Sequence, residues 1–134
     1  MSSYLSNPSI KAFIKTELIK TRTELDNQSL KDIGYQIRIN AAYSLFKTNP
    51  NTIAVTLLDK HRIYLNPEYL TNNLNLIKEI IYHEIAHALL GYLDPTYLYS
   101  TKAHSKQWLK LAKQLGCKHK SRIPIEEYKD DQTN

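Results

Sequence analysis

The segment His83-Glu84-Ile85-Ala86-His87 combines residue types and a spacing that suit a metal site. On an α-helix, residues four apart lie on the same face, so His83 and His87 could bind one metal ion through their imidazoles. Glu84 lies one step around the helix, where it could accept a proton from a metal-bound water without being a ligand. If the segment is helical and a third ligand exists, the pattern predicts a metal-dependent hydrolytic site.

The residues around this motif have the composition of a buried helix. Apolar side chains occur on nearly every side from Leu74 to Leu93, three Asn in residues 72–75 suit an N-cap, and the first interruption is Gly91. A helix that is apolar around most of its circumference belongs in a core, and its charged and His residues argue against a membrane span. Either these polar groups are satisfied inside the core or a metal compensates for their burial, and we favour the metal.

The best third ligand is His104. It opens a segment with helical periodicity that ends at Gly116, a typical C-terminal residue. One face of that helix would carry His104, Trp108, Leu111 and Leu115. We therefore expect His104 on the buried side of its helix, at the N-terminal end. A linker over residues 91–103 is long enough to bring this helix back against the first.

Other candidate ligands have weaker placements. These are His61 at a turn, His119 in a basic stretch beside Cys117, Asp94, and the carboxylates of Glu126 and Glu127. The metzincin arrangement is excluded, because the position six residues after His87 is Leu93.

The elements that must position these residues indicate an α+β fold. We predict a helix from Pro8 to about Leu25, with Ile10, Phe13, Ile14 and Leu18 as its apolar stripe, ending at Asp26-Asn27-Gln28. Strands are expected over residues 35–39, 52–58 and 62–65, the last two joined by a reversal at residues 59–60. Residues 41–47 could extend the first strand or form a bend. The sheet should be largely antiparallel, followed by the motif helix and the helix that carries the third His.

Length and composition indicate one soluble domain. The chain has 134 residues, 42% of them hydrophobic and 23% charged. We expect a core over about residues 8–117 and a C-terminal extension over 118–134. The single cysteine excludes an internal disulfide and a four-cysteine zinc ribbon, and the first residues do not form a secretory signal. A cytoplasmic monomer without a membrane anchor is therefore expected.

From about Tyr35 to Cys117 the chain resembles the SprT-like (Spartan-type) zinc metallopeptidases. The resemblance rests on HEIAHALLG, on a later helix that begins AHSKQW, and on the upstream segment Ile63-Tyr64-Leu65-Asn66-Pro67. It implies a minimal zincin-like fold. Carried over by residue, His83, His87 and His104 match the zinc ligands, Glu84 the catalytic base and Trp108 a packing aromatic. It also implies an endopeptidase that acts on proteins or peptides, with DNA-associated proteins and DNA–protein crosslink repair as the setting.

Two features depart from that family. Ala103 and Ser105 flank the third His where the family usually has Gly, and one cysteine cannot build the zinc ribbon that many members carry. What the resemblance implies is a catalytic core alone. An oxyanion-stabilising side chain is expected as well. Tyr97 and Tyr99 are the nearest candidates by sequence, although ordinary packing is the better explanation for them in a chain with ten tyrosines.

The distribution of charge bears on partners. The formal net charge is +5, and between residues 102 and 122 there are seven basic residues and no acidic one. This stripe consists of Lys102, Lys106, Lys110, Lys113, Lys118, Lys120 and Arg122. It could follow the phosphates of DNA or be a solvated face. Two alternatives stay open. In the first, the protein binds nucleic acid, and its metal, with Cys117, His119 or a terminal Glu as fourth ligand, only joins two helices. In the second, the core contains no metal and the motif is accidental.

Overall fold

The computed structural model describes residues 8–23, 25–40, 43–69, 74–94 and 104–118. The helices are α1 (Pro8–Lys20), α2 (Ser44–Thr48), α3 (Leu74–Leu93) and α4 (Lys106–Leu115), with a short 3-10 helix, η2, over Pro67–Tyr69. The strands are β1 (Gln36–Ile39), β2 (Ala54–Leu57) and β3 (Arg62–Leu65). The predicted α+β class is confirmed, and the predicted elements occur in the expected order. α2 lies in the region around residues 41–47, which had been expected to extend the first strand or form a bend.

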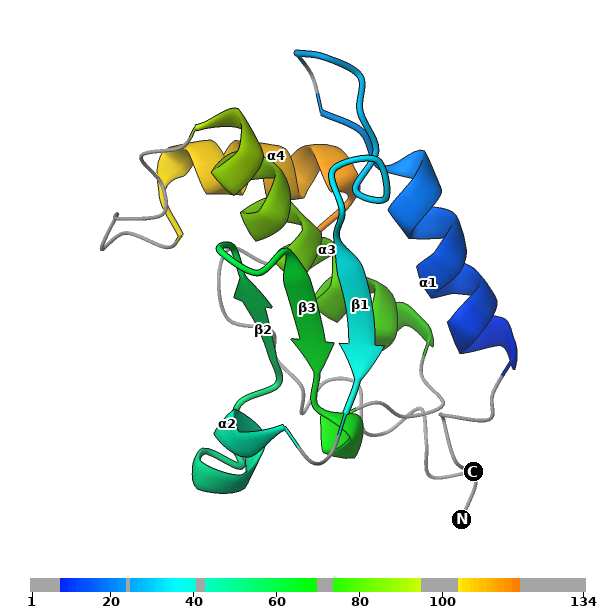
Figure 1. Ribbon diagram of the computed structural model, residues 1–134, viewed down its shortest axis with the longest axis vertical. Coiled ribbons are helices and arrows are strands. Elements are labelled where there is room, and N and C mark those ends of the chain that lie inside the picture. Colours follow the sequence, from blue (N-terminus) through cyan, green and yellow to red (C-terminus); the bar gives the residue numbers. More distant parts are fainter. Residues whose placement is uncertain (1–7, 24, 41–42, 70–73, 95–103, 119–134) are drawn as a thin grey trace.

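The three strands form one mixed sheet in the order β1-β3-β2. As predicted, β2 and β3 form an antiparallel hairpin, in which Ala54 pairs with Leu65 and Leu57 with Arg62. β1, however, runs parallel to β3, so the expectation of a largely antiparallel sheet was wrong for this pair. The segment between β1 and β2, which includes α2, carries the chain past the place of β3 to the opposite edge (Figure 1). β1 and β2 therefore form the two edges of the sheet.

α3 is the central element of the core and lies behind the sheet (Figure 1). Its bounds agree with the prediction, and its buried side chains include Leu76, Ile77, Ile80, Ile81, Ile85, Ala86, Ala88 and Leu89. The helix continues through Gly91, from which the linker to the next helix had been counted. A Cβ at this position would lie 2.8 Å from Leu58 Cδ2, so glycine lets the helix approach the hairpin closely.

α1 is shorter than predicted. It ends at Lys20 instead of continuing to about Leu25, and the Leu25 side chain is 82% exposed. The main chain then turns back, because Leu30 N donates to Thr21 O over 3.2 Å and Thr23 N donates to Gln28 O over 3.0 Å. β-branched Thr has a low helix propensity, which favours this turn over another helical turn. The predicted Ile10 and Ile14 do face the core.

Asn66 connects the end of β3 to the loop that enters β2. Its side-chain Nδ2 donates to Thr52 O over 2.8 Å, and its Oδ1 accepts from Glu68 N over 3.1 Å. The residue is buried, so these bonds replace contacts with water. The Asn-Pro pair thus fixes where η2 begins and where β2 starts.

None of the described helices is both long and apolar enough to cross a membrane.

Candidate metal centre

α3 brings the three residues of the motif to two different neighbours. His83 and His87 are half-buried and lie against α4, and their ring centroids are 5.0 Å apart. Glu84 is 7% exposed and points to β2. This division follows from helical geometry, because residues four apart share a face and the intervening residue does not.

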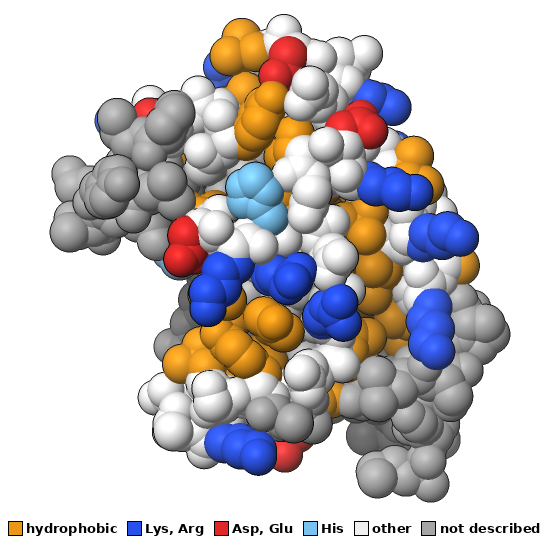
Figure 2. Space-filling view, in the orientation of Figure 1, with side chains coloured by type: hydrophobic (Ala, Val, Ile, Leu, Met, Phe, Trp, Pro, Cys, Tyr) orange, Lys and Arg blue, Asp and Glu red, His pale blue; other side chains and the backbone are white. Residues whose placement is uncertain are grey.

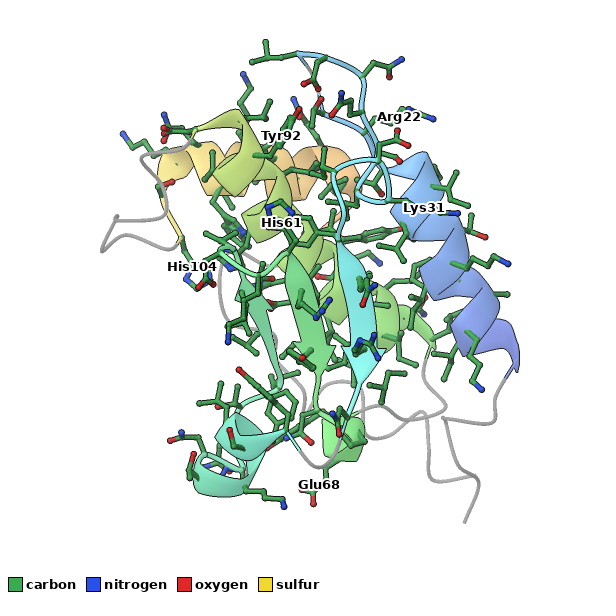
Figure 3. All side chains as sticks on the ribbon, viewed as in Figure 1. Arg22, Lys31, His61, Glu68, Tyr92 and His104 are labelled. Carbon is green, nitrogen blue, oxygen red and sulfur yellow. The ribbon has the colours of Figure 1, made fainter. Side chains whose placement is uncertain are left out.

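His104 joins the two histidines from a separate segment. Its Nε2 lies 3.1 Å from His83 Nε2, and its ring centroid lies 4.9 Å from that of His87. Figure 3 shows it at the start of α4, on the β2 side of the sheet. The expectation that His104 is a buried residue of its helix was wrong in detail, because it precedes the N-cap Ser105 and is exposed. Ser105 Oγ accepts from Trp108 N, so the cap fixes the direction in which the chain leaves the helix.

Trp108 forms the apolar wall of the histidine cluster. Its side chain is fully buried, and its ring lies 5.1 Å from His87, 4.7 Å from His83 and 4.7 Å from His104 between centroids. Trp108 Nε1 donates to the main-chain O of His83 over 3.4 Å. The predicted packing aromatic therefore holds α4 on α3 and restricts all three imidazoles.

Burial keeps the histidines neutral. It lowers the pKa of His83 to about 4, with a further contribution from His104, and it lowers the pKa of His87 to about 3, with contributions from His83 and His104. The pKa of His104 is also lowered by burial. A neutral imidazole has a free nitrogen lone pair, which is the form that binds a metal.

The three residues fit a metal ion. Among the described residues, one ring nitrogen from each of His83, His87 and His104 lies within 4.8 Å of the others. Three nitrogens held about 2.0–2.1 Å from a tetrahedral ion would be about 3.3 Å apart, close to the 3.1 Å between His83 and His104. All three donors are imidazoles, which suit zinc and several other divalent ions.

Thr56 on β2 is the partner of Glu84, and no sequence pattern pointed to it. Its Oγ1 donates to Glu84 Oε1 over 2.9 Å and lies 3.2 Å from the main-chain O of Glu84. The other carboxylate oxygen, Oε2, lies 3.9 Å from His83 Nε2. Burial raises the pKa of Glu84 to about 7, and the Thr56 hydrogen bond acts in the opposite direction. The carboxylate is thus held at one oxygen, while the other faces the histidines.

The remaining candidates lie elsewhere or outside the described residues. His61 is exposed at the β2–β3 turn, where its ring stacks on Tyr35 with centroids 4.8 Å apart. Among the described residues, Asp94 and Cys117 do not place a donor atom in the cluster formed by the three histidines. Cys117 is buried after α4. Outside the described residues lie Tyr97, Tyr99, His119, Glu126 and Glu127.

The basic stripe is described only in part. Lys106, Lys110 and Lys113 are exposed on α4, opposite the buried Trp108 and Leu111, as expected. Lys118 is exposed, and its main-chain N donates to Glu79 Oε1 over 2.8 Å. Lys102, Lys120 and Arg122 lie outside the described residues. Nucleic-acid binding by this stripe, the division into core and extension, the monomeric state and the cytoplasmic location stay predictions.

Comparison with known proteins identifies a family for this chain. No curated protein and no solved structure was found to match the chain. The sequence profile of the SprT-like family matches residues 16–129, which contain the helix with His83 and His87, the segment with His104, and Thr56 on β2. Most of the chain is covered, and the matched residues include His83, His87 and His104, which could hold a metal ion. The chain therefore belongs to the SprT-like family.

Proposed function

We propose that this protein is a zinc-dependent endopeptidase with His83, His87 and His104 as metal ligands and Glu84 as general base. The observation that carries the proposal is the arrangement around Glu84: a buried carboxylate held at one oxygen by Thr56, with its other oxygen 3.9 Å from a cluster of three neutral imidazoles. Membership of the SprT-like family supports it independently.

The ligands are arranged for a catalytic centre more than for a closed structural one. The cluster of described donor atoms contains three residues, and His104 is exposed, so solvent reaches it from one side. Catalytic zinc sites typically have three protein ligands and one open position. Zinc bound there would supply Lewis acidity, which makes water a nucleophile near neutral pH and polarises a peptide carbonyl.

Glu84 would move the proton. Its Oε2 would accept a proton from the attacking water and return it to the amine that leaves when the peptide bond breaks. In the metal-free protein, burial raises the pKa of Glu84 to about 7. A general base works best when its pKa is close to the operating pH. Thr56 would keep Oε1 occupied, so that Oε2 is the oxygen that receives the proton.

The test compares Glu84→Gln with Glu79→Gln, which makes the same chemical change on the same helix. Glu79 is also buried, but it accepts from Lys118 N and stands outside the histidine cluster. Both variants should bind about one zinc per chain, measured by atomic emission after purification. Casein cleavage should fall by at least about a hundredfold in Glu84→Gln and persist in Glu79→Gln. Equal cleavage by wild type and Glu84→Gln would refute the role of Glu84.

DNA-associated proteins are the proposed substrates, because exposed Lys106, Lys110 and Lys113 form one face of α4, which packs against the helix that carries the motif. Reversing these three charges should leave cleavage of free casein intact and reduce cleavage of a protein crosslinked to DNA, more strongly at low salt. Salt-dependent DNA binding without turnover by the wild type would instead favour the alternative, a nucleic-acid-binding protein with a structural metal.

A further inference from the structure

A groove separates α1 from the outer edge of β1, away from the histidine cluster. Its volume is about 460 Å³, and apolar Leu18, Ile19 and Ile37 contribute to its lining. Lys15, Lys31 and Arg38 also line it, and none of the lining residues that the structure describes is acidic. Figure 2 shows an apolar strip there with basic side chains on both of its sides. The groove therefore combines an apolar floor with positively charged walls.

The basic residues of the groove form no ion pair with a carboxylate among the described residues. Ion pairs do form close by, since Lys20 lies 3.8 Å from Glu17 and Arg22 lies 3.6 Å from Asp32. Lys15, Lys31 and Arg38 take part in none of the ion pairs found. The charge of Lys31 is offset in part by that of its neighbour Asp32. An excess of exposed cations around one groove still favours an anionic ligand.

The floor of the groove includes an open strand edge. Among the described residues, β1 is the end strand of the sheet and pairs with β3 alone. Gln36 N donates to His61 O over 3.1 Å, and Asn40 N donates to Leu65 O over 3.4 Å. In a parallel ladder alternate residues bond to the same neighbour, so the main-chain groups of Ile37 and Ile39 point to the outer side. Such an edge can accept another strand.

These features favour a peptide over single-stranded nucleic acid. Proteins that bind single strands stack bases on exposed aromatic rings. The aromatic residue in this lining is Tyr35, which is buried and whose ring stacks on His61. Aliphatic side chains beside a strand edge instead suit the alternating side chains of an extended peptide.

We propose that this groove docks an extended, acidic segment of a partner protein, which adds to β1 as a fourth strand. Its acidic side chains would contact Lys31 and Arg38, and its alternate apolar side chains would lie over Leu18 and Ile19. The metal centre lies beside β2, at the opposite edge of the sheet (Figures 1 and 3). Docking is thus independent of the proposed peptidase activity.

The test uses a fluorescein-labelled peptide of alternating Val and Glu, followed by fluorescence anisotropy. Wild type and Glu84→Gln should bind it equally, which separates this inference from the proposed function. Lys31→Glu and Arg38→Glu should each weaken binding by about tenfold or more, because attraction becomes repulsion. Lys113→Glu, the same change on α4, should have no effect.

Two changes to the ligand test the mode of binding without altering the protein. A peptide N-methylated at every second residue should not bind when the methylated residues are those that face β1. Methylation there removes the N–H donors that pair with the strand edge. A peptide of alternating Val and Lys should not bind. Equal binding of the N-methylated or the Val-Lys peptide, unchanged affinity in Arg38→Glu and Lys31→Glu, or binding of oligo-thymidine in preference to the peptide would each overturn the proposal.

Discussion

Replacing Thr56 with Val tests how the carboxylate of Glu84 is held. Valine has nearly the shape of threonine but lacks the hydroxyl that donates to Glu84 Oε1 over 2.9 Å. A hydrogen bond to a charged group typically contributes about 1.5–3 kcal/mol. If that energy orients the base in the transition state, kcat should fall by about ten- to a hundredfold, since each 1.4 kcal/mol corresponds to about a factor of ten.

The same substitution should shift the pH dependence in a known direction. Burial raises the pKa of Glu84 to about 7, and the Thr56 hydrogen bond opposes that rise. Without this bond the pKa increases further. Because the base must be ionised, the acidic limb of the kcat/KM profile should move to higher pH in Thr56→Val. A purely structural loss would lower the whole profile without moving its limb.

The assay is steady-state cleavage of a fluorogenic peptide by the zinc-loaded protein across a range of pH. Thr56→Ser keeps the hydroxyl and should retain most of the activity with an unmoved limb. Zinc content and KM should stay close to those of wild type in both variants, because Thr56 contacts Glu84 and no histidine of the cluster. Full kcat in Thr56→Val, or an equal loss of kcat in Thr56→Ser and Thr56→Val, would refute this role of the Thr56 hydroxyl.

Three further predictions address the scaffold and the apoprotein. Gly91→Ala should destabilise the protein by about 1 kcal/mol in urea unfolding, because a Cβ placed 2.8 Å from Leu58 Cδ2 outweighs the gain in helix propensity; a combined Leu58→Ala change should remove the penalty, and additive effects would argue against the contact. Trp108→Phe should weaken zinc binding by about tenfold in a chelator competition, because the indole no longer donates to His83 O, and wild-type affinity would show that this support is dispensable. Without metal, Glu84→Gln should be more stable than wild type by up to about 3 kcal/mol above pH 7. Folding raises the pKa of Glu84 from 4.5 to about 7. Ionised Glu84 therefore destabilises the folded wild type, and this cost grows as the pH rises from about 4.5 to about 7. The difference should vanish as pH falls to 4.5, and a difference independent of pH would contradict the assignment.

Local patterns predicted the parts of the fold that local physics determines. α3 was found at its predicted bounds because its apolar residues and its lack of early Gly or Pro leave few alternatives. Trp108 and Leu111 face the core as their spacing indicated, and Gly116 ends α4 in the left-handed conformation with φ of 109°. His83, His87 and His104 lie together as predicted.

Features that depend on distant contacts were not predictable in this way. The parallel pairing of β1 with β3 depends on where the chain crosses the sheet, and strand periodicity carries no information about that. Thr56 resembles any other strand threonine until β2 packs on α3. His104 shows a middle case: Ser105 is a typical N-cap residue, so the helix start could have been placed at Lys106, two residues later, from the sequence.

The position of Trp108 also makes its fluorescence a reporter of metal binding. It is the single tryptophan of the chain, and its ring lies about 5 Å from each imidazole of the cluster. Quenching of tryptophan fluorescence falls off steeply with distance. The fluorescence of Trp108 should therefore depend mainly on the state of the three histidines. A paramagnetic ion such as Co²⁺ should quench the fluorescence on binding, and a colourless ion such as Zn²⁺ should change the fluorescence intensity less. Occupancy of the centre can therefore be followed in unlabelled protein, in real time and apart from turnover.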